Sequence, residues 1–218
     1  MVFRTKYLLH MALMLMLLNW VNTTGEYILG NVVKQTAAGM IASGQANGLS
    51  EGELIGDFYS KYFTMVNVLG LLLQLFVVSR VVKNLGVPWA IMILPFISLT
   101  AYNILAFFPA LYAVLAAKVA ENSTDYSLNN TVRNMLFLPC TYEQKFSAKQ
   151  AIDAFFVRMG DVLSAALVFV GTAILTLQPR GFAAVNAAIV VVWLVLAWRV
   201  GREYKRLTEA GQAPAMRV

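Results

Sequence analysis

The sequence predicts an all-α integral membrane protein with six transmembrane helices. Its 218 residues are 59% hydrophobic and 13% charged, with a mean hydropathy of +0.66. Soluble domains carry charge on about a quarter of their residues. Charge is also absent from five long stretches, between residues 6 and 26, 61 and 80, 83 and 118, 161 and 180, and 180 and 199. Because a membrane-crossing helix needs about 20 mostly apolar residues, these stretches exclude an ordinary soluble domain.

The first three helices are expected over residues 7–33, 53–82 and 87–108. The first is apolar as far as Leu18 and polar afterwards. The second starts after Ser50 and Glu53, whose spacing predicts a capping box that satisfies free backbone amides of the first turn. The third ends at Phe107-Phe108-Pro109, which interrupts an apolar run too long for one crossing and therefore predicts a tight hairpin.

The last three helices are expected over residues 110–138, 149–177 and 182–203, followed by a cytoplasmic tail over 204–218. The fourth helix is unusual because its second half is polar. Neither a long linker nor a low-complexity tract separates these segments, so residues 1–218 are predicted to form a single transmembrane domain. The alternative, a signal peptide with its apolar core over residues 8–18, lacks a convincing small-residue cleavage site.

Basic residues predict the orientation, because cytoplasmic segments of membrane proteins carry an excess of Lys and Arg. One set of segments contains twelve of them: Arg4, Lys6, Arg80, Lys83, Arg133, Lys145, Lys149, Arg199, Arg202, Lys205, Arg206 and Arg217. The opposite set contains three: Lys34, Lys61 and Arg180. With six spans, both termini are therefore expected in the cytoplasm, and the membrane is expected to be the cytoplasmic (inner) membrane.

Polar and ionisable residues within the spans mark the candidate site. Each ionisable group at the bilayer centre costs about 2.5–3.5 kcal/mol or more, so such groups usually face a bundle interior or a water-filled path. They gather on the first, fourth and fifth helices: Asn22, Glu26, Lys118, Glu121, Asn122, Asp125, Arg158 and Asp161. Those of the fourth helix follow three- and four-residue steps and form one stripe. The alternative is that Lys118 with Glu121, and Arg158 with Asp161, are ion pairs that only hold helices together.

The distribution divides the helices into two groups. The first, second, fourth and fifth carry polar groups and are expected to line a pathway, whereas the third and sixth carry almost no charge and are expected to face lipid or act as scaffold. Residues 22–29 also resemble residues 122–128, allowing a one-residue gap. In the derived topology these segments run in opposite directions, as in the three-plus-three inverted repeats of secondary transporters.

Other chemistries find little support. A single Cys and a single His leave no cluster for a structural metal, and neither a cofactor nor a nucleic acid is indicated. The chain contains no HExxH and no GxSxG motif, which argues against an intramembrane enzyme, and no GxxxxGK[ST] loop for ATP hydrolysis.

Residues 126–161 carry a more specific pattern. The chain has Tyr126-Ser127-Leu128, Arg133, Met135, Pro139, Lys145, Lys149, Ala151-Ile152-Asp153, Arg158 and Gly160. This spacing resembles, without gaps, a motif of the bacterial and plastid ATP/ADP translocase family: Tyr-Ser-Leu, a Lys at position 133, Met, Pro, Lys-x-x-x-Lys-x-Ala-Ile-Asp and Arg-x-Gly-Lys. Because members have twelve helices, the chain resembles their C-terminal half alone.

The resemblance implies half of a major-facilitator-type bundle that exchanges adenine nucleotides by alternating access. It adds Tyr126 to the substrate-binding or coupling candidates and implies a cytoplasmic gate formed by Arg133, Lys149 and Asp153. It also implies a partner, either a second copy in a homodimer or a separate six-helix half.

Two departures from the family motif leave more than one substrate class consistent with the sequence. Asp161 stands where the family has Lys, and Asn134 where it has Glu. The helices also hold more carboxylates than cations, whereas nucleotide phosphates favour Arg and Lys. A proton-coupled carrier of another polar metabolite is therefore one alternative, and a membrane scaffold that lost transport is another.

Overall fold

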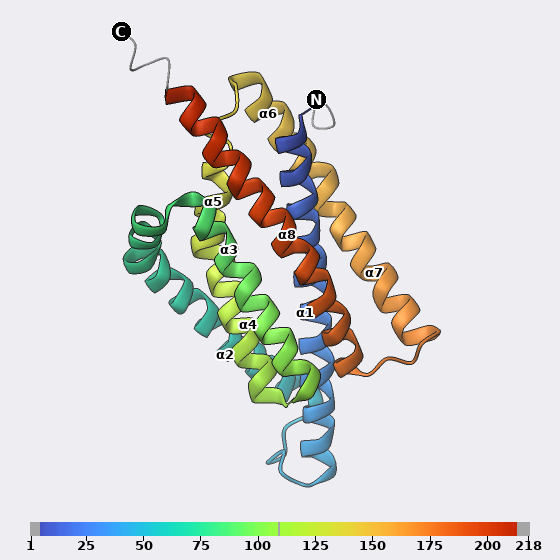
Figure 1. The fold of residues 1–218 in the computed structure, drawn as a ribbon. Coiled ribbons are helices and arrows are strands. Elements are labelled where there is room, and N and C mark those ends of the chain that lie inside the picture. Colours follow the sequence, from blue (N-terminus) through green and yellow to red (C-terminus); the bar gives the residue numbers. More distant parts are fainter. Residues whose placement is uncertain (1–4, 109, 213–218) are drawn as a thin grey trace.

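The computed structural model describes residues 5–108 and 110–212, which are helical apart from short connections and contain no strand. The elements in chain order are α1 (Lys6–Ala42), α2 (Glu51–Leu72), η2 (Leu73–Val77), α3 (Val78–Phe107), α4 (Leu111–Thr124), η3 (Asp125–Asn129), α5 (Asn130–Met135), α6 (Tyr142–Ala151), η4 (Ile152–Phe156), α7 (Val157–Ala173) and α8 (Pro179–Gln212). The three η segments are π-helical turns that continue into their flanking α-helices without a loop. The start of α1 and the end of α8 lie at the same end of the bundle (Figure 1).

Gly86 divides the long helical run from α2 to α3. Its φ of 74° and ψ of 166° are non-helical, so α3 consists of two helices joined at this residue. Only glycine adopts such a conformation without strain. Pro88 lies in the first turn after the break, where its missing amide costs no helical hydrogen bond. The chain therefore reverses direction between residues 51–85 and 87–107.

Four helical runs are long and apolar enough to cross a membrane: Lys6–Ala42, Glu51–Phe107, Tyr142–Ala173 and Pro179–Gly211. The second run has 57 residues, or about 85 Å of helix. The part before Gly86 and the part after it are each long enough to cross a membrane. The run 111–135 is not among the four, because Lys118, Glu121 and Asp125 interrupt its apolar sequence. The run 111–135 is polar in composition, so its burial depends on packing against the neighbouring helices.

Several helix ends differ from the sequence-based expectation. α1 continues to Ala42 rather than ending at residue 33, and α6 begins at Tyr142 rather than 149 because Thr141 and Gln144 form a capping box. α7 ends at Ala173, and α8 continues to Gln212, so the expected tail is helical as far as the structure describes it. The predicted capping box of Ser50 and Glu53 is confirmed.

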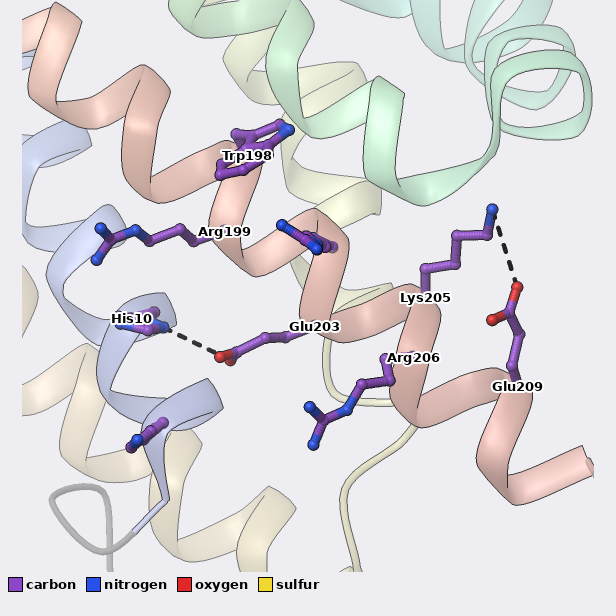
Figure 2. Close-up of a pocket in the computed structure, with 9 residues that line it drawn as sticks. His10, Trp198, Arg199, Glu203, Lys205, Arg206 and Glu209 are labelled. Carbon is purple, nitrogen blue, oxygen red and sulfur yellow. Dashed lines mark ion pairs between the residues drawn. The ribbon is translucent and has the colours of Figure 1, made fainter.

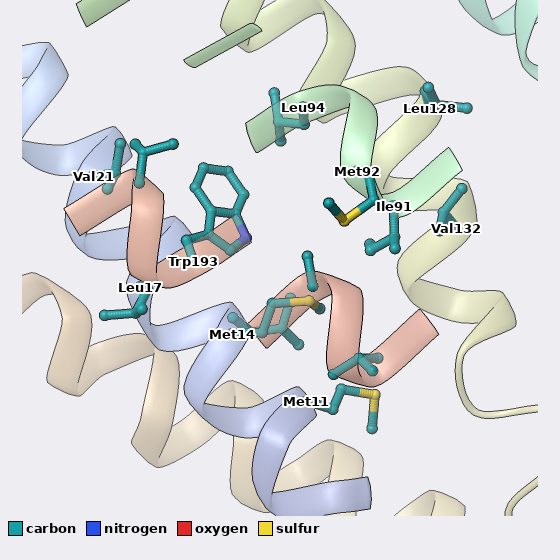
Figure 3. Close-up of a cluster of buried hydrophobic side chains, with 14 of the residues drawn as sticks. Met11, Met14, Leu17, Val21, Ile91, Met92, Leu94, Leu128, Val132 and Trp193 are labelled. Carbon is teal, nitrogen blue, oxygen red and sulfur yellow. The ribbon is translucent and has the colours of Figure 1, made fainter. Parts of the chain in front are cut away.

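The core forms where α1, α3 and α8 meet. Figure 3 shows Met11, Met14, Leu17 and Val21 along α1 in one cluster with Trp193 of α8, Ile91, Met92 and Leu94 of α3, and Leu128 and Val132. α7 packs along α1, and α2 packs mainly on α4. α2 and α7 consequently flank the bundle, and both expose large apolar side chains.

Candidate functional site

Lys118 of α4 is the centre of a buried polar cluster. Its side chain is 1% exposed, and its Nζ lies 2.8 Å from Oε2 of Glu121 and 3.2 Å from Oε1 of Glu26. The ammonium also donates to Oδ1 of Asn22 at 2.8 Å. Lys118 therefore joins a carboxylate of its own helix to a carboxylate and an amide of α1, far apart in the sequence.

Glu26 connects this cluster to the outside. Its Oε1 also accepts from Nδ2 of Asn122 at 2.8 Å and from the hydroxyl of Tyr62 at 3.4 Å. Tyr62 is fully buried and Asn122 nearly so, whereas the Glu26 side chain is 38% exposed. Glu26 is thus the carboxylate of the cluster that a solute can reach.

Glu121 lies at the buried side of the cluster, with its side chain 5% exposed. Oε1 accepts from the hydroxyl of Ser98 at 2.6 Å, and Oε2 lies 3.1 Å from the hydroxyl of Tyr102. A Cβ at Gly25 would overlap the Tyr102 hydroxyl and approach Lys118, so only glycine leaves room for this packing. Hydroxyl groups of α3 therefore share the stabilisation of the Glu121 carboxylate with Lys118.

The cluster holds two carboxylates and one ammonium, which is a formal excess of one negative charge. In a low-dielectric interior such a charge is tolerated only when hydrogen-bond donors surround it. Neutral donors complete the shell here: Ser98, Tyr102, Tyr62 and Asn122. The arrangement is more than an ion pair within α4, because α1, α2 and α3 each contribute.

A second polar site joins α1 to α7. Oδ1 of Asp161 accepts from Nδ2 of Asn19 at 2.7 Å and from the Thr23 hydroxyl at 2.9 Å, and Oδ2 lies 3.3 Å from Nη1 of Arg158. A Cβ at Gly160 would lie 2.6 Å from the Met16 carbonyl oxygen, so the two helix backbones are in close contact. The Arg158 side chain is 77% exposed apart from its contact with Asp161.

A third group lies nearer the end with the loop 136–141. Arg133 of α5 forms an ion pair with Asp153 of η4, and Nζ of Lys149 donates to Oδ1 of Asn134 at 3.1 Å. All three residues expected at a gate thus connect the segment before the loop to the segment after it. Both partners of the ion pair are partly exposed.

Asp125 and Tyr126 lie outside the hydrogen-bonded cluster around Lys118, although Asp125 continues the predicted stripe to Asn129. Oδ1 of Asp125 accepts from Nδ2 of Asn129 at 2.6 Å, and Tyr126 is 54% exposed. Among the described residues, neither hydrogen-bonds to Lys118 or its partners. Both lie in η3, a π-helical turn in which the four-residue contact between Asp125 and Asn129 is kept.

The hydroxyl-bearing residues of the cluster were not identified from the sequence, unlike Asn22 and Asn122. The third and sixth helices carry no charge in it, yet Ser98 and Tyr102 of α3 contact Glu121, and Nδ2 of Asn186 of α8 donates to the Val21 carbonyl at 3.1 Å. Tyr62 of α2 is a further addition. The only sequence signal for these residues was a polar side chain within an otherwise apolar helix. In the described part of the chain, no group of three or more His, Cys, Asp or Glu could hold a metal ion.

Comparison with known proteins identifies a family. A family model described as TLC ATP/ADP transporter matches residues 50–204, more than two thirds of the chain. The matched range includes Lys118, Arg133 and Arg158 but not α1, which supplies Asn22 and Glu26. No curated protein and no solved structure matches the chain.

Proposed function

This chain belongs to the TLC ATP/ADP transporter family, and we propose that it exchanges nucleotides across a membrane by alternating access. The resemblance noted over residues 126–161 is confirmed by the family match, which includes that range. The helical runs fit an integral membrane protein. Within this proposal the chain is a six-helix half of a major-facilitator-type carrier, with inverted three-helix repeats, in the inner membrane and with both termini in the cytoplasm.

The observation that carries the proposal is the buried cluster around Lys118 of α4, to which α1, α2 and α3 each contribute side chains. Groups of opposite charge buried between apolar helices are costly, and in membrane proteins they usually serve transport or coupling. Lys118 is held between Glu121, which is buried, and Glu26, which is partly exposed. A substrate or ion that binds Glu26 changes the charge balance of the whole cluster, which is the coupling that a carrier needs.

Nucleotide phosphates require exposed cations, and Arg158 is the best placed of those on the pathway helices. Its guanidinium is largely exposed while its backbone is fixed by the α1–α7 contact. Arginine binds phosphate oxygens in a bidentate manner that lysine cannot match. We therefore assign substrate binding to Arg158, with Asp161 orienting it, and coupling to the Lys118 cluster.

A second six-helix half completes the pathway in this proposal. The helices that flank the bundle expose large apolar side chains, among them Phe63, Val68 and Leu71 on α2 and Val162 and Phe169 on α7. These surfaces suit lipid or a partner equally in composition. A homodimer supplies a second Arg158 and doubles the positive charge available to an anionic substrate.

The Arg133–Asp153 pair is proposed to act as the cytoplasmic gate, together with Lys149. The pair connects the helices on either side of the loop 136–141, and its partial exposure makes it easy to break and reform. Surface pairs of this kind contribute about 0–1 kcal/mol, so a substrate can displace one at little cost.

A proton-coupled carrier of another polar metabolite is the second candidate. The exposed carboxylate of Glu26, next to a lysine that already has another carboxylate partner, is the observation that favours it. Protonation of Glu26 would remove the excess negative charge without disturbing Glu121. Such a carrier would move cations or zwitterions and would leave ATP and ADP untouched.

Counterflow in liposomes tests these alternatives. The purified protein is reconstituted, its mass is determined in the same detergent preparation, and uptake of labelled ATP, ADP and a panel of cationic and zwitterionic metabolites is measured. Nucleotide counterflow that is lost in Lys118→Ala and Arg158→Ala, but kept in the exposed control Lys61→Ala, supports the proposal. Uptake of another metabolite supports the second candidate. No uptake of any compound favours the scaffold alternative.

A further inference from the structure

A basic groove lies between the beginning of α1 and the end of α8, apart from the Lys118 cluster. Its volume is about 940 Å³, and its cationic or titratable lining comprises Lys6, His10, Arg199, Arg202, Lys205 and Arg206. Figure 2 shows these side chains with two acidic neighbours around the same concavity. None of them belongs to the proposed pathway.

The basic groove is lined by more cationic than anionic side chains. Oε2 of Glu203 lies 3.5 Å from Nδ1 of His10, and Oε1 of Glu209 lies 3.9 Å from Nζ of Lys205 (Figure 2). In the described part of the chain the remaining cations form no ion pair: Lys6, Arg199, Arg202 and Arg206. Four unpaired cations around one concavity favour binding of an anion with several oxygen atoms.

The position of the groove along α8 matches the edge of a membrane. No charge occurs between Arg180 and Arg199, and these 18 residues span about 27 Å of helix, close to the thickness of the hydrocarbon core. Trp198 is 51% exposed, and the Arg202 guanidinium lies 5.5 Å from its ring centre. Tryptophan is enriched at this boundary, where lipid headgroups begin.

We propose that the basic groove binds a phosphate-bearing anion, supplied in the membrane by the headgroup of an anionic phospholipid. The guanidinium groups of Arg199, Arg202 and Arg206 contact the phosphate oxygens, and Trp198 packs against the glycerol and the upper acyl chain. Basic pockets at the cytoplasmic ends of transmembrane helices recognise such headgroups by charge and hydrogen bonding. A free phosphate compound offers the same chemistry without the acyl chain, so the test separates the two sources.

The experiment measures lipid binding to the full-length protein in detergent by native mass spectrometry, with phosphatidylglycerol as ligand and phosphatidylcholine as the zwitterionic reference. The test variant carries Arg199→Gln, Arg202→Gln and Arg206→Gln. The control carries Arg80→Gln, Lys83→Gln and Lys145→Gln, which removes three exposed cations at the same end of the bundle outside the groove. We expect phosphatidylglycerol to bind the test variant at least about tenfold more weakly than the control, with no change for phosphatidylcholine.

Equal weakening in both variants would overturn the proposal, because it would mean unspecific attraction to basic residues. Displacement of phosphatidylglycerol by millimolar inorganic phosphate or ATP would keep the phosphate chemistry but overturn the lipid as its source. A photoactivatable phosphatidylglycerol gives a readout on the unmodified chain, should the variant fold poorly. It should label peptides that contain residues 6–10 and 198–206, and labelling only elsewhere would contradict the proposal.

Discussion

Replacing Lys118 by methionine should destabilise the protein strongly, and a second substitution should restore stability without restoring transport. Lys118→Met removes the ammonium that contacts Glu121 at 2.8 Å, Glu26 at 3.2 Å and Asn22 at 2.8 Å. Glu121, 5% exposed, is left as a buried carboxylate with only hydroxyl partners. Breaking a buried pair in this way costs about 3–5 kcal/mol. Glu26 contributes less, because its side chain is 38% exposed.

For a chain of this size the loss corresponds to a fall in Tm of about 6–20 °C. The double variant Lys118→Met/Glu121→Gln no longer contains the uncompensated buried charge of Glu121; one of the two hydroxyls that contact Glu121 can donate to the amide oxygen, and the other can accept from the amide nitrogen. Its Tm should return to within a few degrees of wild type. Thermal unfolding in detergent, followed by size-exclusion chromatography, measures both variants, and counterflow measures transport. A wild-type Tm for Lys118→Met would refute the buried pairing, and transport by the double variant would refute the coupling role.

Three further predictions follow from the helix contacts. Gly160→Ala should lower stability by about 1–3 kcal/mol and reduce transport, because its Cβ would meet the backbone of α1, whereas Gly39→Ala, with open space around it, should not destabilise the protein. Tm and counterflow check both. Burial raises the pKa of the Cys140 thiol, so a membrane-impermeant maleimide should label it more slowly at pH 7.5 than an exposed cysteine, faster as pH rises, and only from the cytoplasmic side. Labelling from both sides, or from the opposite side alone, would contradict the orientation. Arg133→Gln should change stability by less than about 1 kcal/mol but alter exchange rates, and the charge swap with Asp153 should restore them if the pair acts as the gate.

The sequence pattern predicted the members of the Lys118 cluster where the helices are regular. Lys118, Glu121 and Asn122 follow α-helical spacing and do share a face. Glu26 was a candidate because it is an ionisable residue of the first helix, but its pairing with Lys118 was not predicted. Asp125 continues the stripe into η3, where it accepts a hydrogen bond from Asn129 four residues later, and its role in the site stays a prediction.

The hydroxyl-bearing partners Ser98, Tyr102 and Tyr62 could not be predicted from residue spacing. A tyrosine in an apolar helix is compatible with a lipid-facing, core or hydrogen-bonded position, and only the packing of α3 against α1 and α4 distinguishes them. Tyr102 contributes its hydroxyl because Gly25 has no side chain to block it. The pairing of a glycine with a tyrosine 77 positions later carries no periodic signal.

In the described residues, the π-helical segments interrupt three of the four helical runs that supply candidate pathway residues, whereas α1 has none. η2, η3 and η4 each lie within about four helical turns of the end that carries Gly86 and the loop 136–141. The helix over residues 87–107 and α8 contain none. Because a π-turn interrupts the regular hydrogen-bond ladder, a helix bends there at lower cost than elsewhere. Asp153 of the proposed gate lies in η4, whereas Lys118 lies in the regular α4. If the Arg133–Asp153 pair acts as the gate, we predict that bending at η4 opens it while α4 stays regular around Lys118.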